Sequence, residues 1–88
     1  MAKKIVYGTH AEEKFDILKR HGFLISKRQV RDTLRKPERL EEGFRGRKVV
    51  QRKISATHVL QVVYEEKQSE IVIVTFYPGR RSRYESSI

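Results

Sequence analysis

The sequence predicts an α+β domain, with two helices packed on a three- to four-stranded antiparallel sheet. Two capping boxes predict the helices: Thr9 precedes Glu12, and Ser26 precedes Gln29, at the spacing of that motif. In a capping box the two side chains satisfy each other's backbone amides at a helix start. Three runs rich in β-branched and aromatic residues then follow, at 47–54, 57–65 and 70–77. Such runs, separated by short connections, are typical of antiparallel strands.

The composition is that of a small and strongly basic domain. The 88 residues include 20 Lys and Arg against 11 Asp and Glu, which gives a formal net charge of +9. A field of that sign attracts nucleic acid, an anionic membrane or an acidic protein. Because the chain has no cysteine, neither disulfides nor thiolate zinc sites are available to it. We expect a single domain over residues 1–88, with residues 84–88 frayed.

No targeting or membrane-spanning segment is expected. Lys3 and Lys4 give the amino terminus the positive start of a signal peptide, but no apolar segment of the required length follows them. The longest apolar run is far shorter than the roughly 20 residues that span a bilayer. We therefore expect a soluble cytoplasmic protein.

The first helix is expected to run from Thr9 to about His21, with Gly22 as the left-handed residue that ends it. The second begins at Ser26 and ends before Pro37, since the residue before a proline avoids α geometry. The connection between the two helices is short. We therefore expect them to lie as an antiparallel hairpin.

The strands differ in polarity. The run at 70–77 is the most apolar and lacks polar alternation, which predicts an inner strand. Pro78 and Gly79 follow it and are expected to end it. The run at 47–54 is far more polar and predicts an exposed or edge strand, and residues 5–7 predict a short edge strand.

Two groups of cations are candidates for binding a polyanion. The first follows the Pro-Gly turn and includes a tyrosine: Arg80, Arg81, Arg83 and Tyr84. The second is a stripe at i, i+3 and i+7 of the second helix: Arg28, Arg31 and Arg35. For the helix alone, a solvated polar face explains the stripe better than a binding face. The first group predicts contacts to phosphates, and RNA is the polyanion we expect.

The order of the elements and several short strings resemble the RelE/ParE toxin superfamily. More closely, the chain is similar to a branch of small domains near the BrnT-like toxins. The resemblance covers residues 7–84 and rests on four features of the sequence: His10 at the first helix, the string Arg-His-Gly-Phe at 20–23, Leu-Gln-Val-Val-Tyr at 60–64 and the run at 71–77. It implies a RelE-like fold, with a helical hairpin on a small antiparallel sheet.

The resemblance also implies a function. RelE-type members cleave messenger RNA without a metal, often on the ribosome, and an antitoxin protein holds them inactive. ParE-type members share the fold but act on DNA gyrase, so the fold does not decide the activity. The branch most similar to this chain has no activity that the family assigns. The resemblance therefore points to RNA, including ribosome-bound mRNA, and to an antitoxin as partners.

Metal-free RNA cleavage needs a base for the ribose 2′-hydroxyl, cations around the phosphorane and a proton for the departing oxygen. The expected cations are those after the turn, joined by Arg52 if its strand lies alongside. The candidates for proton transfer or base stacking are His58, His10 and Tyr84. A semi-buried structural role fits His58 better than a catalytic one, since it shares a strand face with apolar residues. His10 fits a polar neighbour of the first helical turn equally well.

The expected function is thus a toxin-like, metal-independent endoribonuclease. No metal-ligand spacing, P-loop or dinucleotide fingerprint is found in the sequence, so no cofactor is expected. Two alternatives stay open: a non-catalytic RNA- or DNA-binding module, and an interaction protein that binds an acidic protein partner. RNA cleavage in the presence of a chelator would separate the first reading from the other two.

Overall fold

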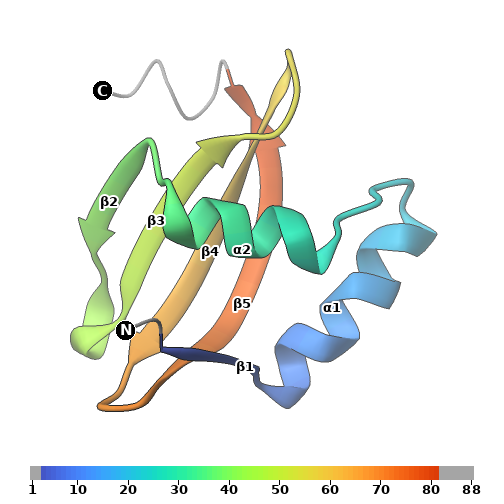
Figure 1. Cartoon of the computed structure of the whole chain (residues 1–88). Coiled ribbons are helices and arrows are strands. Elements are labelled where there is room, and N and C mark those ends of the chain that lie inside the picture. The colour runs from blue at the N-terminus through green and yellow to red at the C-terminus, as the bar shows by residue number, and fades with distance from the viewer. Residues whose placement is uncertain (1–2, 82–88) are drawn as a thin grey trace.

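The computed structural model describes residues 3–81. Figure 1 shows one twisted sheet with both helices on the same face. The helices are α1 (Thr9–Arg20) and α2 (Lys27–Arg35). The strands are β1 (Lys4–Tyr7), β2 (Arg39–Glu42), β3 (Lys48–Lys53), β4 (His58–Glu66) and β5 (Glu70–Arg80), with a 3-10 turn at Phe44–Gly46 between β2 and β3. The predicted α+β class is confirmed.

The sheet has five strands and is mixed, so the predicted three- to four-stranded antiparallel sheet was wrong. The strand order is β1-β5-β4-β3-β2. Three of the pairings are antiparallel, but β1 pairs with β5 in parallel, Lys4 lying opposite Glu70. The sequence carried no signal for this pairing, because four residues show no clear periodicity and their partners lie at the far end of the chain. The polar strand β3 is an inner strand, and β2 takes the edge.

β5 does not end at the Pro-Gly pair. It continues through Pro78 and Gly79, which lie opposite Leu60 and Val59 of β4. The Arg81 N–H donates to the Thr57 carbonyl of the turn before β4 (2.9 Å). The N–H groups of successive residues in a strand point to opposite sides, so the backbone nitrogen of Pro78 faces away from β4. On that side β5 pairs with β1, but only at residues 70–73. Within residues 3–81, therefore, no strand lies where it would accept the N–H that proline lacks.

The core lies between the helices and one face of the sheet. The register places Leu60, Val62 and Tyr64 of β4 on that face, and all three are buried. Ala11 of α1 and Val30 of α2 are fully buried against them. In this row of inward positions, His58 precedes Leu60 at the end of the sheet. The packing that fills the centre of the domain therefore also fixes the direction in which His58 points.

The two helices do not form the predicted antiparallel hairpin. α1 packs over β5 and β1, whereas α2 packs over β4 and β3. Figure 1 shows them running at a steep angle to each other, joined by the connection at 21–26. The connection is short, but it also has to step across the sheet from β5 to β4. Among the residues described, no helix is both long and apolar enough to cross a membrane.

One of the two predicted capping boxes is present. Ser26 accepts the N–H of Gln29 (3.1 Å), and the Gln29 amide oxygen accepts the N–H of Ser26 (2.9 Å). The predicted box at Thr9 was wrong, because α1 begins one residue earlier with Gly8 as its N-cap. The Gly8 N–H is held by the Ile73 carbonyl (3.1 Å) as the chain leaves β1. The carboxylate of Glu12 pairs instead with Lys27 of α2 (3.2 Å).

Candidate functional site

A hollow of about 440 Å³ lies where β4 begins and β5 ends. The described residues that line it include two arginines and a histidine: Ala56, Thr57, His58, Arg80 and Arg81. In Figure 1 this is the upper end of the sheet. The two strands bring together residues that are more than twenty positions apart in the chain. Of the predicted site residues, His58, Arg80 and Arg81 meet here.

The turn beside the hollow is held by its own hydrogen bonds. The Ser55 hydroxyl accepts the N–H groups of Thr57 (3.3 Å) and His58 (3.0 Å). From the other strand, the Arg81 guanidinium donates to the Ala56 carbonyl (3.1 Å). The end of β5 is thus tied to the turn by both the backbone and the side chain of Arg81. A hydrogen-bonded frame of this kind keeps the side chains of a site in place.

His58 is held on one ring nitrogen. Its Nδ1 lies 2.8 Å from the Thr57 hydroxyl oxygen, and its ring packs in an edge-to-face arrangement on Phe23, with centroids 5.6 Å apart. The hydroxyl can accept from Nδ1 or donate to it. The first choice leaves Nε2 as a proton acceptor, and the second leaves it as a donor. His58 therefore has a fixed ring with its second nitrogen left for proton transfer.

Arg80 places a positive charge beside His58. The two residues are cross-strand partners, and side chains in such a pair have Cβ atoms roughly 4.5–5.5 Å apart. Arg80 is exposed and makes no hydrogen bond or ion pair with any described residue. Among the residues that the structure describes, none that lines the hollow is a carboxylate. A cation beside an imidazole, with no anion among these described neighbours, is suited to receiving a phosphate.

Phe23 was not among the predicted site residues. The end of α1 delivers it to His58 through a pair of hydrogen bonds: Gly22 N–H to the Lys19 carbonyl (3.1 Å) and Phe23 N–H to the Leu18 carbonyl (2.8 Å). Gly22 takes the predicted left-handed conformation, with φ of 87°. This is the Schellman motif, which turns the chain sharply at a helix end. The motif was visible in the sequence, but its position beside β4 was not.

Arg52 lies on the same sheet face but in a different hollow. Its guanidinium donates to the Lys36 carbonyl at the end of α2 (2.8 Å) and lines a space of about 260 Å³ with Asp32, Arg35 and Lys36. In register Arg52 is opposite Leu60, one inward position from His58. Strand geometry puts the two backbones about 8 Å apart. Arg52 thus completes a helix end near the candidate site and does not line it.

The predicted arginine stripe on α2 is exposed. Arg28, Arg31 and Arg35 lie on the outer side of the helix, while Val30 and Thr33 are buried on the inner side. Burial raises the pKa of the Tyr7 hydroxyl, and the nearby Arg31 charge acts in the opposite direction. Arg35 also lines the space that holds Arg52. The stripe extends the basic surface on the helix side without entering the hollow.

Three other predicted site residues do not join the hollow. His10 is exposed on the first turn of α1, just after Gly8, whose N–H binds the Ile73 carbonyl. Seven positions of β5 separate Ile73 from Arg80, which corresponds to about 23 Å. His10 is therefore at the opposite end of the sheet. Arg83 and Tyr84 lie outside the described residues.

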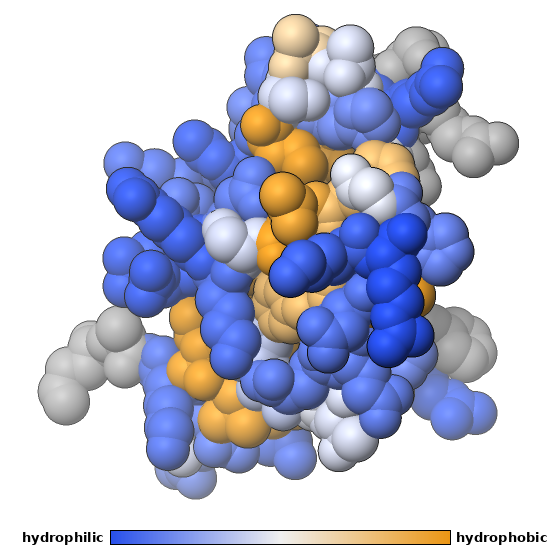
Figure 2. All heavy atoms as spheres, turned by 90° about the vertical axis from the view of Figure 1, so that its right-hand side faces the viewer, coloured by the Kyte–Doolittle hydropathy of each residue, from blue (hydrophilic) through white to orange (hydrophobic). Residues whose placement is uncertain are grey.

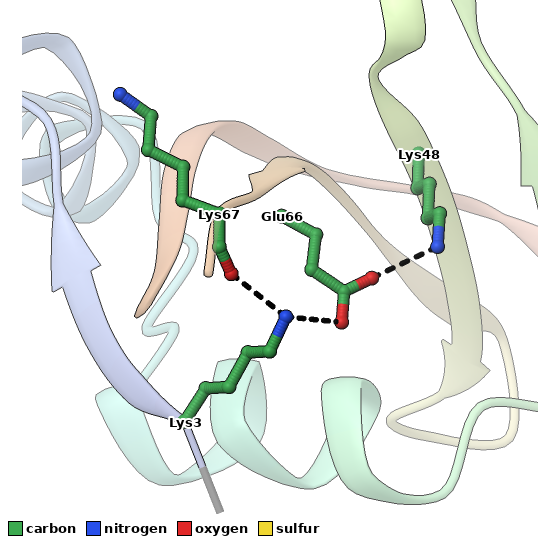
Figure 3. Close-up of polar contacts among 4 residues, drawn as sticks. All are labelled: Lys3, Lys48, Glu66 and Lys67. Atoms are coloured by element: carbon green, nitrogen blue, oxygen red, sulfur yellow. Dashed lines mark hydrogen bonds and ion pairs between the residues drawn. The ribbon is translucent and has the colours of Figure 1, made fainter. Parts of the chain in front are cut away.

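That opposite end holds a second charged cluster, drawn in Figure 3. The Glu66 carboxylate lies between the ammonium groups of Lys3 (3.0 Å) and Lys48 (2.9 Å). Lys3 also donates to the Lys67 carbonyl (2.7 Å). The hydrogen bonds from Lys48 and Lys3 lower the pKa of Glu66 to about 2. Here Lys3 and Lys48 share the Glu66 carboxylate, which links β3, β4 and the residue before β1.

Within residues 3–81, no three His, Asp or Glu side chains come together in a way that could hold a metal ion. The side chains that line the hollow offer an imidazole for proton transfer and guanidinium groups for electrostatic binding. Comparison with protein-family models, with curated proteins and with solved structures found no match for this chain. The resemblance to RelE/ParE toxins rests on the order of the predicted elements and on the sequence strings.

Proposed function

We propose that this chain is a toxin-like, metal-independent endoribonuclease, and that the hollow between the start of β4 and the end of β5 is its cleavage centre. The observation that carries the proposal is the joint lining of this hollow by His58, Arg80 and Arg81. A fixed imidazole and adjacent guanidinium groups are two of the components that cleavage of a ribose phosphodiester requires.

The reaction would be an internal transfer of the phosphoryl group. His58 Nε2 takes the proton from the ribose 2′-hydroxyl, and the oxygen attacks the adjacent phosphorus. The bond to the 5′-oxygen breaks, which leaves a 2′,3′-cyclic phosphate on one fragment and a 5′-hydroxyl on the other. Arg80 and Arg81 stabilise the charge that develops on the phosphorane oxygens. No second imidazole lines the hollow, so the 5′-oxygen takes its proton from water in this scheme.

The partners that follow from this proposal are messenger RNA and an antitoxin protein. Both come from the resemblance to RelE-type toxins, which act on mRNA and are blocked by a bound partner. The net charge of +9 supports association with either a polyanion or an acidic protein. Action on cytoplasmic, ribosome-bound mRNA belongs to the same proposal.

A second candidate function is a non-catalytic RNA- or DNA-binding module. One observation favours it: His58 is the one imidazole in the lining, whereas cleavage by general acid and general base uses two proton-transfer groups. Arginines alone are sufficient to bind phosphates. The two functions share one surface and differ only in turnover.

Turnover in a chelator is therefore the test. Purified protein is incubated with end-labelled single-stranded RNA in excess EDTA, and the fragments are analysed for cyclic phosphate ends. We expect cleavage by the wild type and a loss of about 10²-fold or more in Arg80→Ala, as for removal of one transition-state charge contact. Intact RNA with the wild type, in the presence of measurable binding, would transfer the assignment to the binding module.

A further inference from the structure

An exposed aromatic ring stands directly beside the basic hollow. Three large apolar side chains are exposed on α1 and the connection after it: Ile17 (41%), Phe23 (36%) and Leu24 (77%). Figure 2 looks onto this side of the molecule and shows apolar side chains grouped in the middle of the face, with hydrophilic side chains on both sides. Of the three, only Phe23 offers an aromatic face.

Phe23 differs from its neighbours in how firmly it is placed. Its backbone N–H donates to the Leu18 carbonyl (2.8 Å). Its ring is in edge-to-face contact with the ring of His58. The two rings stand at 69° to each other, with centroids 5.6 Å apart. The two rings form a corner, and one of them, the imidazole of His58, also lines the hollow together with Arg80. Leu24 follows in sequence and is the most exposed of the three.

This arrangement matches the chemistry of one nucleotide. Proteins that bind single-stranded nucleic acid combine a positive groove for the backbone with aromatic rings on which bases stack. Here the positive groove contains Arg80, and the ring is next to the imidazole that lines it. An aliphatic protein partner would gain as much from Leu24 and Ile17 as from Phe23. Only a flat aromatic ligand distinguishes Phe23 from the other two.

We infer that Phe23 is a stacking platform for a nucleobase whose adjacent phosphate lies at Arg80, so that the site accepts single-stranded RNA and excludes duplex. The inference rests on the proposed function, because it places the RNA in the same hollow. In a duplex the bases are already stacked and paired, and no face is open to Phe23. The corner formed by Phe23 and His58 sets the base on one side of the imidazole and the phosphate on the other.

The test uses binding without turnover. A short 2′-O-methyl RNA cannot be cut, because the attacking hydroxyl is blocked; it carries a single 2-aminopurine, whose fluorescence changes when it stacks. Its affinity for the protein is measured by fluorescence anisotropy, as a single strand and annealed to its complement. The variants are Phe23→Leu, which keeps apolar bulk, Phe23→Tyr, which keeps the ring, and Leu24→Ala as the matched control.

We expect the wild type to quench 2-aminopurine at one position of the strand and to bind the single strand more tightly than the duplex. Phe23→Leu should weaken single-strand binding about 5- to 100-fold, the range for loss of one base stack. Phe23→Tyr and Leu24→Ala should each stay within about twofold of wild type. Far-ultraviolet circular dichroism shows whether Phe23→Leu is folded. If it is not, the presence or absence of 2-aminopurine quenching by the wild type tests the stacking.

Four results would overturn the inference. Unchanged affinity in Phe23→Leu, or equal affinity for the duplex, would remove the stacking platform. Equal losses in Phe23→Leu and Leu24→Ala, or a change of oligomeric state in both, would make the patch a general apolar contact with a protein. Arg80→Ala separates this failure from that of the proposed function: if it loses affinity while Phe23→Leu does not, the RNA site stands without the platform. If Phe23→Leu loses affinity but unmodified RNA is never cut, the platform stands in a binding module.

Discussion

The two ends of strand β4 use charge in opposite ways. At its last residue, Glu66 is bound between Lys3 and Lys48, and each ammonium has a carboxylate partner. At its first residue, His58 faces Arg80 across the ladder, and within residues 3–81 no carboxylate lines the hollow around them. The strand separates the two clusters by about 26 Å. A count of basic residues would treat these ends as equal, although their local structure is different.

The difference indicates which cations are available to a ligand. Lys3 and Lys48 hold β1, β4 and β3 together, and a phosphate there would have to compete with Glu66. Arg80 has no such competitor among the described residues. A basic surface therefore becomes a binding site where carboxylates are missing, and not simply where Lys and Arg are numerous.

The largest expected effect is on cleavage at the His58 end. His58→Ala removes the only imidazole in the hollow, so its rate of RNA cleavage should fall by about 10²–10⁴-fold, the usual contribution of a general base. His10→Ala removes a histidine at the other end of the sheet and should retain the wild-type rate. Initial rates on labelled RNA in EDTA measure both variants. A comparable loss in His10→Ala would mean that the wrong end was identified.

A smaller effect is expected from the residue that holds the ring. Thr57→Val removes the hydroxyl bonded to His58 Nδ1 and should lower the cleavage rate about tenfold, the value of one hydrogen bond of about 1.4 kcal/mol. Thr57→Ser retains the hydroxyl and should restore most of the rate. RNA affinity should be unchanged in both variants. Loss of affinity together with rate would show that Thr57 shapes the hollow and does not orient the imidazole.

The turn that carries Phe23 should tolerate little change in its backbone. Gly22 has φ of 87° and nothing within 4 Å of the position that a Cβ would occupy. The cost of Gly22→Ala therefore comes from the left-handed backbone conformation and not from a clash with neighbouring atoms. We expect a loss of about 1–2 kcal/mol in the free energy of unfolding, measured by urea denaturation. Gly22→Asn should cost less, because asparagine tolerates the left-handed region better than alanine does. Equal costs in the two variants would contradict this reading of the turn.

The smallest effect belongs to the ion cluster at the other end. The folded-state pKa of Glu66 is lowered from 4.5 to about 2, so its stabilising contribution is present above pH 4.5 and is lost as the pH falls towards 2. Glu66→Gln should lower the melting temperature slightly at pH 7, because exposed ion pairs are screened by water. The difference from wild type should shrink between pH 4.5 and 2. A difference that does not change over that range would assign the effect to packing.

Local patterns in the sequence predicted local structure well. The Ser26 capping box, the left-handed Gly22 and the end of α2 before Pro37 all depend on residues within a few positions of each other, and each is confirmed. The box at Thr9 failed because a contact outside the local segment intervened: β5 holds Gly8 and moves the helix start by one residue. The parallel β1–β5 pairing was missed for the same reason.

The candidate site was predicted in part. His58 and Arg80 came together because a hairpin of two long strands makes them neighbours, and that topology was evident in the sequence. Arg52 was expected beside them, but a helix end close to its strand supplies a carbonyl that its guanidinium binds. Phe23 was missed because its place beside His58 depends on where α1 ends above the sheet. Such a contact depends on the packing of three elements, and no spacing in the sequence records it.

The most direct test of the account compares the two ends by salt dependence. Affinity for single-stranded RNA is measured from 50 to 300 mM salt for the wild type, for Arg80→Ala with Arg81→Ala, and for Lys3→Ala with Lys48→Ala. Both variants lose two positive charges. Each phosphate contact adds about 0.7 to the slope of log affinity against log salt for single strands. We predict that the arginine pair lowers the slope by about 1.4 and that the lysine pair leaves it unchanged, whereas equal reductions in both would contradict the account.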